Sequence, residues 1–591
     1  MAKKTVSNMS HYEGYSERCY NGYKKTSEYI AMSDGCKLAV DIYRPTIDGK
    51  LHEEPLPLLW CATQYRRARI KEDGSITDLK ESAVLWFVPQ MPMILEHGYI
   101  VAAVDVRGSG ASFGNGCAQT VTLQEFYDLY DCNEWLAALP YTTHETGMFG
   151  ISYLGSCQWM CSMMSPPSLK CIVPTSAPFS NPYLRINGID NYAWPQHVDD
   201  SLYEQNVVNP SPAVDEDTDG SMRRAAIEDH KTNPHTLSLR QTGYYYDDTL
   251  PYYNSKIYME ADFARFYHNV NTSGIACYII EGLRDFLVTD AYDWFVNLKT
   301  PKRLAVGPWD HANVKNSEAP FNFGTELLRW YDYWLKGIDN GIMDEPAVHI
   351  YNDVAEEWRT YPDFPVPGIK DGVYYLQSKR AGSIDSVNDG SMGTRPPSGS
   401  SETTKYTVDY STTTRGFEDR NFYNTPGNRD YRDFDRKAVT FTTPPLSADM
   451  NVVGFPVIKL WLSANTESID VFAYIQDVDE EGFSQNVTEG MLRSNFRGTI
   501  EPPFNHMGLP YHMNRKQDDK PLPDGAPVLM EFNTSVISRT FKAGHRIRLA
   551  ITNFNRENWL TPEVSPAPEV TIYSNQEYPS QIVFPVVKNG N

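Results

Sequence analysis

The sequence predicts an α/β fold in its first part and an all-β fold in its last part. Apolar strand patterns alternate with helical patterns between residues 55 and 178, which is typical of a mainly parallel, doubly wound sheet. The same alternation resumes over residues 274–337 after an interruption. Beyond residue 450, short alternating strands are separated by turn residues, as in a β-sandwich or jelly roll. A chain of 591 residues is also too long for a single core.

We therefore predict three units. The core comprises residues 1–179 and 272–355, and a mainly helical cap, residues 180–271, is inserted in it. The cap segment is rich in Tyr, Asn, Asp and Pro and breaks the alternation of strands and helices. Residues 356–591 are predicted to form a C-terminal jelly-roll β-sandwich, in which the Ser/Gly/Thr-rich stretch 379–414 is expected to contain long loops.

The first expected element is a hairpin over residues 24–45, where apolar and polar residues alternate on both sides of Ser33-Asp34-Gly35. Continuous apolar runs predict buried strands at 55–63, 99–106, 169–178, 274–282 and 302–309. Helices are expected over 80–97, 122–139, 290–299 and 324–337. In the last part, strands are expected at 451–464, 470–479, 527–536 and 545–553.

The composition excludes several classes of function. Asp and Glu number 75 against 53 Lys and Arg, a net charge of −22 that opposes binding to nucleic acid or to anionic lipid. There is no apolar run of about 18 residues and no visible secretory signal. Nine cysteines, none after Cys277, suggest a reducing compartment, and we expect a cytoplasmic protein. Because CxxC and HExxH patterns are absent, we expect no metal and no cofactor.

The stretch from Gly147 to Gly155, Gly-Met-Phe-Gly-Ile-Ser-Tyr-Leu-Gly, predicts a strand, a tight turn carrying Ser152, and a helix. A serine at such a corner has an exposed hydroxyl above a helix N-terminus. The literal G-x-S-x-G pattern occurs instead at Ser112, but the surrounding glycines predict a loop and no helix begins there. We therefore predict that Ser152 is the nucleophile.

A nucleophilic serine needs a base, an acid that orients the base, and donors for the oxyanion. In α/β-hydrolases the chain order is Ser, Asp or Glu, then His, each after a strand. Asp285 follows the predicted strand 274–282, and His311 follows the predicted strand 302–309. Position alone leaves rivals open, which are His268 and His349 for the base and Asp290, Asp293 and Asp310 for the acid.

Several motifs in this order resemble the cocaine-esterase-like CocE/NonD serine hydrolases, which share a fold with X-Pro dipeptidyl-peptidases and α-amino acid ester hydrolases. The motifs are Asp105-Val-Arg-Gly-Ser-Gly110, Trp135-Leu-Ala-Ala-Leu-Pro140, Gly150-Ile-Ser-Tyr-Leu-Gly155, Gly282-Leu-Arg-Asp285, Gly307-Pro-Trp-Asp-His311, Tyr333-Trp-Leu-Lys-Gly337 and Phe541-Lys-Ala-Gly-His-Arg-Ile-Arg-Leu549. The resemblance covers nearly the whole chain. It implies an α/β-hydrolase core, an inserted helical cap and a C-terminal jelly roll.

The resemblance also implies a catalytic site. It places the triad on Ser152, Asp285 and His311, and it assigns Ser112 to the family's glycine-rich loop. It further implies that the hydroxyl of Tyr65 and the backbone N–H of Tyr153 form the oxyanion hole. The residues alone would not have singled out Tyr65 among 38 tyrosines.

The chain also departs from the family. Gln64 replaces the proline that usually precedes the oxyanion tyrosine, and Phe286-Leu-Val-Thr289 lacks the carboxylates that hold a substrate ammonium group in amino acid ester hydrolases. This argues against α-amino acyl substrates and favours an apolar acyl pocket at Phe286 and Leu287. Aromatic residues of the cap could line that pocket or form the cap's own core; they are Tyr192, Trp194 and Tyr244–Tyr246.

We expect a serine hydrolase that cleaves a small-molecule carboxylic ester through an acyl-enzyme. An amidase or acylase, an X-Pro-type peptidase and an acyltransferase remain alternatives on the same site. A non-catalytic carbohydrate-binding protein, using jelly-roll aromatics such as Trp461, is less favoured because the set of candidate catalytic residues is complete. We expect no nucleic-acid or membrane partner, and the resemblance allows a homodimer.

Overall fold

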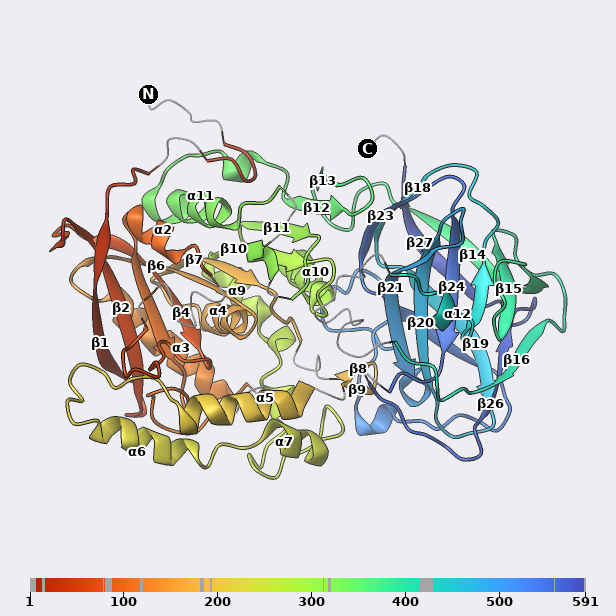
Figure 1. The fold of residues 1–591 in the computed structure, drawn as a ribbon, viewed down its shortest axis with the longest axis horizontal. Coiled ribbons are helices and arrows are strands. Elements are labelled where there is room, and N and C mark those ends of the chain that lie inside the picture. The colour runs from red at the N-terminus through yellow and green to blue at the C-terminus, as the bar shows by residue number, and fades with distance from the viewer. Residues whose placement is uncertain are drawn as a thin grey trace.

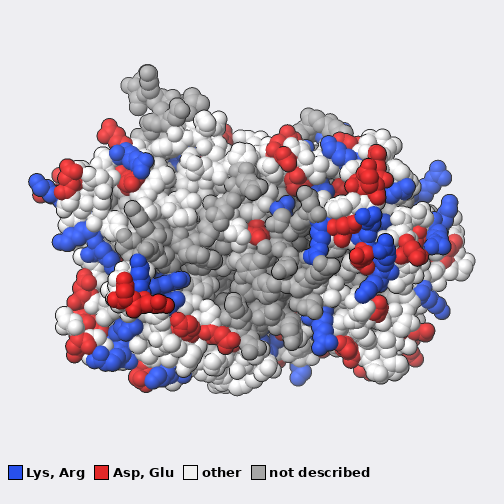
Figure 2. Space-filling model, viewed as in Figure 1, with Lys and Arg blue, Asp and Glu red and all other residues white. Residues whose placement is uncertain are grey.

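The computed structural model describes residues 7–12, 16–77, 79, 88–116, 121–180, 185–191, 194–311, 313–316, 320–414, 429–556 and 559–588. Within them an α/β core and an all-β domain lie side by side (Figure 1), which confirms the predicted fold class. Figure 2 shows acidic and basic side chains interspersed at both ends of the visible face. No helix among the described residues has the length and apolar character needed to cross a membrane.

The core is an 11-stranded sheet in the order β1-β2-β5-β4-β6-β7-β10-β11-β12-β13, with β3 paired to β2. Its strands are β1 (Gly22–Ala31), β2 (Lys37–Ile47), β3 (Lys50–Leu51), β4 (Leu56–Thr63), β5 (Ile100–Asp105), β6 (Thr142–Ile151), β7 (Leu169–Thr175), β10 (Ala276–Gly282), β11 (Lys302–Gly307), β12 (Val348–Asn352) and β13 (Glu357–Tyr361). The strands from β5 to β12 pair in parallel, whereas the hairpins at both edges are antiparallel.

Helices cover both faces of this sheet. They are α2 (Met91–Glu96), α3 (Leu123–Ala137), α4 (Tyr153–Met163), α9 (Tyr267–Ser273), α10 (Val288–Asn297) and α11 (Phe323–Lys336). Apolar residues of α3, α4, α9 and α10 share one buried cluster, and those of α2 and α11 share another. The parallel strands are therefore buried on both faces, which explains why their sequences are continuously apolar. Of the helix expected over 80–97, the described part shows α2, and residues 80–87 lie outside the described residues.

Local signals explain where the covering helices begin and end. In α3, Thr122 and Glu125 form a capping box, in which the Glu125 side chain accepts from the Thr122 N–H at 2.7 Å. In α11, the Asn322 side chain accepts from the Thr325 N–H at 3.0 Å, and Gly337 ends the helix with φ +65°. Both helices thus start on side chains that satisfy otherwise unpaired backbone N–H groups.

The segment between β7 and β10 is mainly helical, and its assignment as a cap with the bounds 180–271 stays a prediction. It contains short strands β8 (Arg185–Ile186) and β9 (Ile189–Asn191), then α5 (Trp194–Tyr203), a π-helical turn (Glu204–Val208), α6 (Ser221–His230), α7 (Thr236–Thr242) and α8 (Ile257–Glu260). In Figure 1 helices α5, α6 and α7 lie along the lower edge of the core. Strand β9 pairs with β25 (Trp559–Leu560), so this segment also joins the C-terminal domain.

The C-terminal domain is a 13-stranded arrangement with its own apolar core. Its strands are β14 (Lys370–Arg380), β15 (Asn388–Gly393), β16 (Thr403–Thr407), β17 (Val439–Thr442), β18 (Met450–Gly454), β19 (Val457–Ala464), β20 (Asp470–Val478), β21 (Ser484–Arg493), β22 (Val528–Asn533), β23 (Ile537–Phe541), β24 (Arg546–Thr552), β26 (Glu569–Tyr573) and β27 (Gln581–Val587). Side chains of β19 alternate between buried and half-buried, as the sequence pattern predicts for a sandwich.

Residues 379–414 contain loops over 381–387 and 394–402, together with two strands that the sequence analysis did not predict, β15 and β16. Strand β15 reads Asn-Asp-Gly-Ser-Met-Gly and has no apolar alternation, but its backbone pairs with β14 and β17. Gly390 lies against the ring of Phe441, where a Cβ would approach within 2.5 Å. The predicted boundary at 355/356 stays a prediction; the hairpin of β12 and β13 in the core sheet spans it.

Candidate active site

Ser152 lies at a strained corner between β6 and α4. Its backbone angles are φ +62° and ψ −122°, a region that residues with a side chain rarely adopt. The Ser152 N–H donates to the Thr175 carbonyl of β7 at 2.9 Å, and the Ser152 carbonyl accepts from the Ser156 N–H at 2.9 Å. These bonds hold the corner from both sides, so the strain is supported by neighbouring backbone.

Two glycines make room for this corner. A Cβ on Gly150, where φ is +141°, would lie 2.4 Å from Cβ of Leu154. A Cβ on Gly155 would lie 2.7 Å from the carbonyl oxygen of Thr175, the same oxygen that accepts from Ser152. The glycine one place later than the G-x-S-x-G pattern therefore lets α4 pack directly on the end of β7.

His311 lies between Ser152 and Asp285. Its Nε2 is 2.9 Å from Oγ of Ser152, and its Nδ1 is 2.9 Å from Oδ2 and 3.2 Å from Oδ1 of Asp285. Because the carboxylate accepts at Nδ1, the neutral ring carries its proton there and leaves Nε2 free to accept from the serine. The structure thus brings together the three residues predicted from chain order.

Asp285 is 2% exposed and stands just after β10. Its Oδ1 also accepts from the Leu287 N–H at 3.0 Å. Burial alone would raise the pKa of Asp285. The charge and the hydrogen bond of His311, together with the contacts of Asp285 with Glu281 and the Leu287 N–H, outweigh burial and lower this pKa. Asp285 is therefore ionised at neutral pH and can orient the imidazole.

Tyr65 stands two residues after β4, and its hydroxyl lies within reach of the Ser152 side chain. Burial raises the pKa of Tyr65, so the phenol keeps its proton as a donor must. Tyr153 is the first residue of α4, and its N–H is one of those that a helix leaves without an internal acceptor. Both predicted oxyanion donors thus lie beside Ser152.

The Tyr153 side chain points away from the nucleophile. Its hydroxyl donates to Oε1 of Glu125 on α3 at 2.5 Å, and its ring meets that of Tyr65 edge-on, with centroids 6.3 Å apart. Burial raises the pKa of Glu125 to about 7. The side chain anchors the first turn of α4, which leaves only the backbone N–H for the oxyanion hole.

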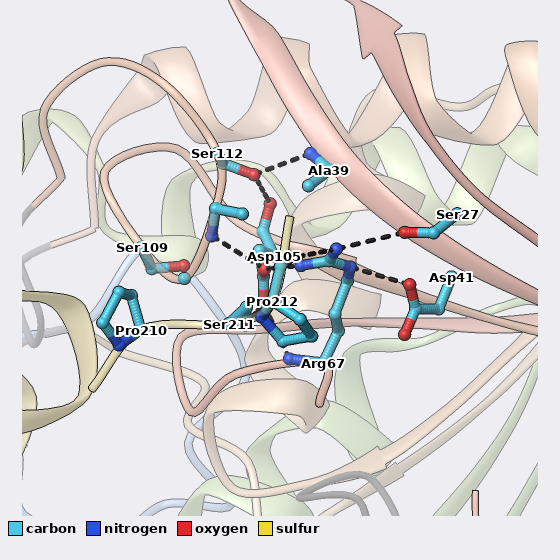
Figure 3. Close-up of polar contacts among 12 residues, drawn as sticks. Ser27, Ala39, Asp41, Arg67, Asp105, Ser109, Ser112, Pro210, Ser211 and Pro212 are labelled. Carbon is cyan, nitrogen blue, oxygen red and sulfur yellow. Dashed lines mark hydrogen bonds and ion pairs between the residues drawn. The ribbon is translucent and has the colours of Figure 1, made fainter. Parts of the chain in front are cut away.

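Ser112 is structural. Its hydroxyl donates to the Asp105 carbonyl at 2.5 Å and accepts from the Ala39 N–H at 2.8 Å, and the residue is fully buried (Figure 3). The Asp105 side chain pairs with Arg67 at 2.7 Å, and the same guanidinium pairs with Asp41 at 2.9 Å. This buried ion cluster fixes the segment that carries Tyr65 two residues earlier.

The rival acids and bases have other partners. Asp290 accepts from the Phe179 N–H at 2.6 Å, Asp293 pairs with His506 at 2.9 Å, and Asp310 accepts from Asn313. The rival histidines have other surroundings: the His268 ring lies tilted against that of Tyr267, and burial lowers the pKa of His349, beside Arg303, to about 3. None of these contacts involves the Ser152 hydroxyl.

A cavity of about 220 Å³ lies between the core, the cap segment and the C-terminal domain, and its lining includes none of Ser152, Asp285 and His311. Phe286 lines it, and its ring also packs on His311 with centroids 5.0 Å apart. The rest of the lining mixes polar residues such as Asp290, Asn187 and Ser535 with apolar residues such as Ile186, Met491 and Trp559. The predicted apolar pocket residue Leu287 is 3% exposed and belongs to the buried core, outside this lining.

The cap aromatics are placed as follows. Tyr192 lies outside the described residues, and Trp194 begins α5 but its side chain is not among those described. The Tyr246 hydroxyl donates to Asp262 at 2.7 Å, and the Tyr245 hydroxyl donates to Asp519 at 2.7 Å. Tyr244–Tyr246 therefore contribute to the cap's own packing and to its contact with the C-terminal domain.

Among the described residues, no group of three or more His, Cys, Asp or Glu is placed to hold a metal ion.

The site also contains buried carboxyl groups that the sequence interpretation did not single out, Glu125 and Glu281. Glu281 lies in β10, whose other residues are apolar or glycine, and Glu125 lies on α3 together with two other buried polar residues, Asp128 and Asn133. The sequence signal that could have identified them is a charged residue in a buried strand or on the buried face of a helix, because such groups are rarely buried without a partner.

Comparisons with known proteins bear on the family to which the chain belongs. The chain matches the family model of the X-Pro dipeptidyl-peptidase (S15 family) over residues 34–313 and that of the X-Pro dipeptidyl-peptidase C-terminal non-catalytic domain over residues 340–583. A Mycobacterium bovis protein named as a serine esterase is 26% identical over 628 residues, with 96% of each chain covered. The cocaine esterase of a Rhodococcus species is 24% identical over 603 residues, covering 95% of this chain and 98% of its own.

Solved structures show the same fold over the whole chain. A CocE/NonD family hydrolase from Staphylococcus aureus superposes with a TM-score of 0.71 at 17% identity, covering 96% of this chain and 94% of its own. The two matched domains, the full-length relatives and the shared fold lead to one assignment. The chain belongs to the S15-type serine hydrolases, the enzyme family that includes CocE/NonD hydrolases and X-Pro dipeptidyl-peptidases.

Proposed function

We propose that this serine hydrolase cleaves a carboxylic ester through an acyl-enzyme on Ser152. The observation that carries the proposal is the position of His311, whose two ring nitrogens each lie 2.9 Å from their partners, Ser152 Oγ and Asp285 Oδ2. This arrangement lets one imidazole take a proton from the nucleophile while a carboxylate stabilises the imidazolium that forms.

In the first half of the reaction, Oγ of Ser152 attacks the ester carbonyl and its proton passes to Nε2 of His311. The negative charge that develops on the carbonyl oxygen is held by the Tyr65 hydroxyl and the Tyr153 N–H. Both donors are fixed before the reaction, since Tyr65 lies within reach of Ser152 and Tyr153 begins α4. The imidazolium then protonates the leaving alcohol, and the acyl group stays on Ser152.

In the second half, His311 removes a proton from water, and the resulting hydroxide attacks the acyl-enzyme. The same two donors hold the second oxyanion, and collapse releases the acid and restores the Ser152 hydroxyl. Asp285 stays ionised throughout, because its role is to hold the ring proton on Nδ1 and to offset the imidazolium charge.

The choice of an ester rests on relatives. Two curated relatives matched over at least 95% of this chain carry esterase names. The matched family model is named for an X-Pro dipeptidyl-peptidase, so amide or peptide cleavage is the second candidate. A panel of p-nitrophenyl esters and the matching p-nitroanilides, with X-Pro anilides included, separates the two, and an added alcohol acceptor tests acyl transfer. We expect the ester members to be cleaved at least 100-fold faster than their anilides.

A carbohydrate-binding role for the jelly roll has weaker support. The Trp461 ring packs on Tyr578 with centroids 5.1 Å apart and is half-buried. A ring engaged in this way offers less free surface for a sugar to stack on. We therefore propose hydrolysis, and not sugar binding, as the function of this protein.

The decisive test uses a fluorophosphonate probe, which reacts with activated serines. Ser152→Ala is expected to abolish both turnover and labelling, whereas Ser112→Ala, checked for folding by thermal melting, is expected to keep labelling. Labelling that persists in the folded Ser152→Ala variant would show that another residue is the nucleophile.

A further inference from the structure

Glu281 is a buried carboxyl group directly behind the triad. It is the last residue but one of β10 and is fully buried in a strand whose other residues are Ala-Cys-Tyr-Ile-Ile and Gly. Its Oε1 accepts from the Ser176 hydroxyl at 3.1 Å and from the Gly282 N–H at 2.9 Å. Oε1 of the carboxyl group thus accepts two hydrogen bonds.

The other oxygen faces an acceptor. Oε2 of Glu281 is buried and receives no donor from any described residue, yet the Glu281 and Asp285 side chains lie within hydrogen-bonding reach of each other. Asp285 already accepts from His311 on both oxygens and from the Leu287 N–H on Oδ1. Two ionised carboxylates cannot bond to one another, so one of the pair carries a proton. The contacts leave Glu281 as the group that carries it.

The charges around Glu281 support the same assignment. Across the described part of the chain no lysine, arginine or histidine forms an ion pair with it, whereas Asp285 pairs with His311. The titratable groups that face the two carboxyls are Tyr292 of α10, Asp310 after β11, and His311 itself. Burial, followed by the charge of Asp285, raises the pKa of Glu281 well above its usual range.

We propose that Glu281 is a neutral carboxylic acid that donates a hydrogen bond to Asp285 and thereby positions it for His311. This bond also ties the triad back to the Ser152 corner. Glu281 accepts from the Ser176 hydroxyl, and the residue before Ser176, Thr175, accepts from the Ser152 N–H. Glu281 is a positioning residue, since it touches Asp285 and not the reacting atoms. The role rests on the proposed function, in which Asp285 orients the catalytic base.

A matched pair of variants separates donation from bulk. Glu281→Gln keeps a donor for Asp285 and an acceptor for Ser176, and we expect its kcat to stay within about 3-fold of wild type. Glu281→Met has a similar size but no donor; we expect kcat to fall on the order of 10- to 100-fold with little change in KM, since Asp285 loses its orientation. Equal losses in both variants, with both folded by thermal melting, would overturn the donor role.

The pH profile reports the charge of Glu281. If Glu281 is neutral, Glu281→Gln removes no charge, and the acid limb of kcat/KM keeps its midpoint within about 0.2 pH units. If Glu281 were ionised, its replacement would remove a negative charge near His311 and move that limb to lower pH by about half a unit or more. Such a shift would overturn the proposal.

Infrared spectroscopy tests the proton without using catalysis. At neutral pH, the wild-type minus Glu281→Gln difference spectrum is expected to contain the carbonyl stretch of a protonated carboxylic acid. A carboxylate pair of bands in its place would overturn the proposal. This readout is independent of the proposed function: failed labelling of Ser152 refutes the hydrolytic mechanism and leaves the infrared result standing.

Discussion

The Tyr153 hydroxyl donates to Oε1 of Glu125 across 2.5 Å, and this bond joins α3 to the first residue after the Ser152 corner. Oε2 of the same carboxyl accepts from the Thr122 N–H at the start of α3. One buried acid therefore caps a helix and anchors the turn that presents Ser152, the proposed nucleophile. The protonation state of Glu125 should therefore affect the stability of the enzyme toward unfolding.

The stability of the protein is predicted to fall as Glu125 ionises. Burial raises the pKa of Glu125 from 4.5 to about 7, so the folded state holds the proton more tightly than the unfolded chain does. This contribution is fully present below about pH 4.5 and is lost as pH rises through about 7, which amounts to about 3 kcal/mol. Glu125→Gln removes the titration, because its amide can still accept from Thr122 while Tyr153 turns to accept from the amide. Thermal melting between about pH 5 and 8 should show a steeper fall for wild type; parallel curves would contradict this prediction.

Tyr65 and Tyr153 are predicted to contribute to catalysis in different ways. Tyr65→Phe removes an oxyanion donor, and we expect kcat to fall on the order of 100- to 1000-fold with little change in KM. Tyr153→Phe keeps the backbone N–H, so kcat should fall by less than about 10-fold, while loss of the bond to Glu125 should cost about 1–3 kcal/mol of stability. Steady-state kinetics and thermal melting of both variants check this. Equal losses of kcat would mean that the Tyr65 hydroxyl is not a special donor.

Asp285 is predicted to be the acid of the triad despite three neighbouring rivals. Asp285→Asn should lower kcat by about 10,000-fold, because an amide at this position can favour the wrong tautomer of His311. Asp310→Asn is the matched control: Asp310 is adjacent to His311 in sequence but bonds to Asn313, and we expect less than about a 3-fold change. A large loss in the Asp310 variant with a small loss in the Asp285 variant would reverse the assignment.

The sequence predicted the fold class and the elements that carry the site, because continuous apolar strands and amphipathic helices follow directly from burial. Ser152 could be predicted from its strand–turn–helix setting, and Asp285 and His311 from chain order. Tyr65 could be predicted only by resemblance, since nothing local distinguishes a strand-end tyrosine. The strand β15 was missed because it is held by backbone pairing and carries no apolar alternation.

The buried acids and the pocket could not be predicted, for a different reason. Glu281 depends on Ser176, which lies 105 positions earlier, and Glu125 depends on Tyr153, which lies 28 positions later. No local pattern predicts such pairs, because the fold brings their members together from distant positions in the chain. Phe286 lines a cavity, and its role in a substrate pocket stays a prediction; most of the lining comes from the cap segment and from loops of the C-terminal domain, whose positions no local pattern specifies.

Arg67 is predicted to be the main support of the Tyr65 segment. Its guanidinium is fully buried, pairs with Asp41 and Asp105, and donates to the Pro212 carbonyl of the cap segment at 2.8 Å. Arg67→Met leaves two buried carboxylates without this partner, so we expect a loss of about 3–5 kcal/mol of stability. The Tyr65 segment also loses its anchor, and kcat of the folded fraction should fall by about 10-fold or more.

The matched control for Arg67 is Arg436→Met, which removes an exposed pair with Asp433 at 2.6 Å. An exposed pair of this kind contributes at most about 0.5 kcal/mol, so both stability and kcat should stay near wild type. Denaturant unfolding and steady-state kinetics of the two variants measure the difference. If Arg67→Met were as stable and as active as Arg436→Met, the buried ion cluster would have no role in holding the oxyanion donor, and the position of Tyr65 would depend on the β4 strand alone.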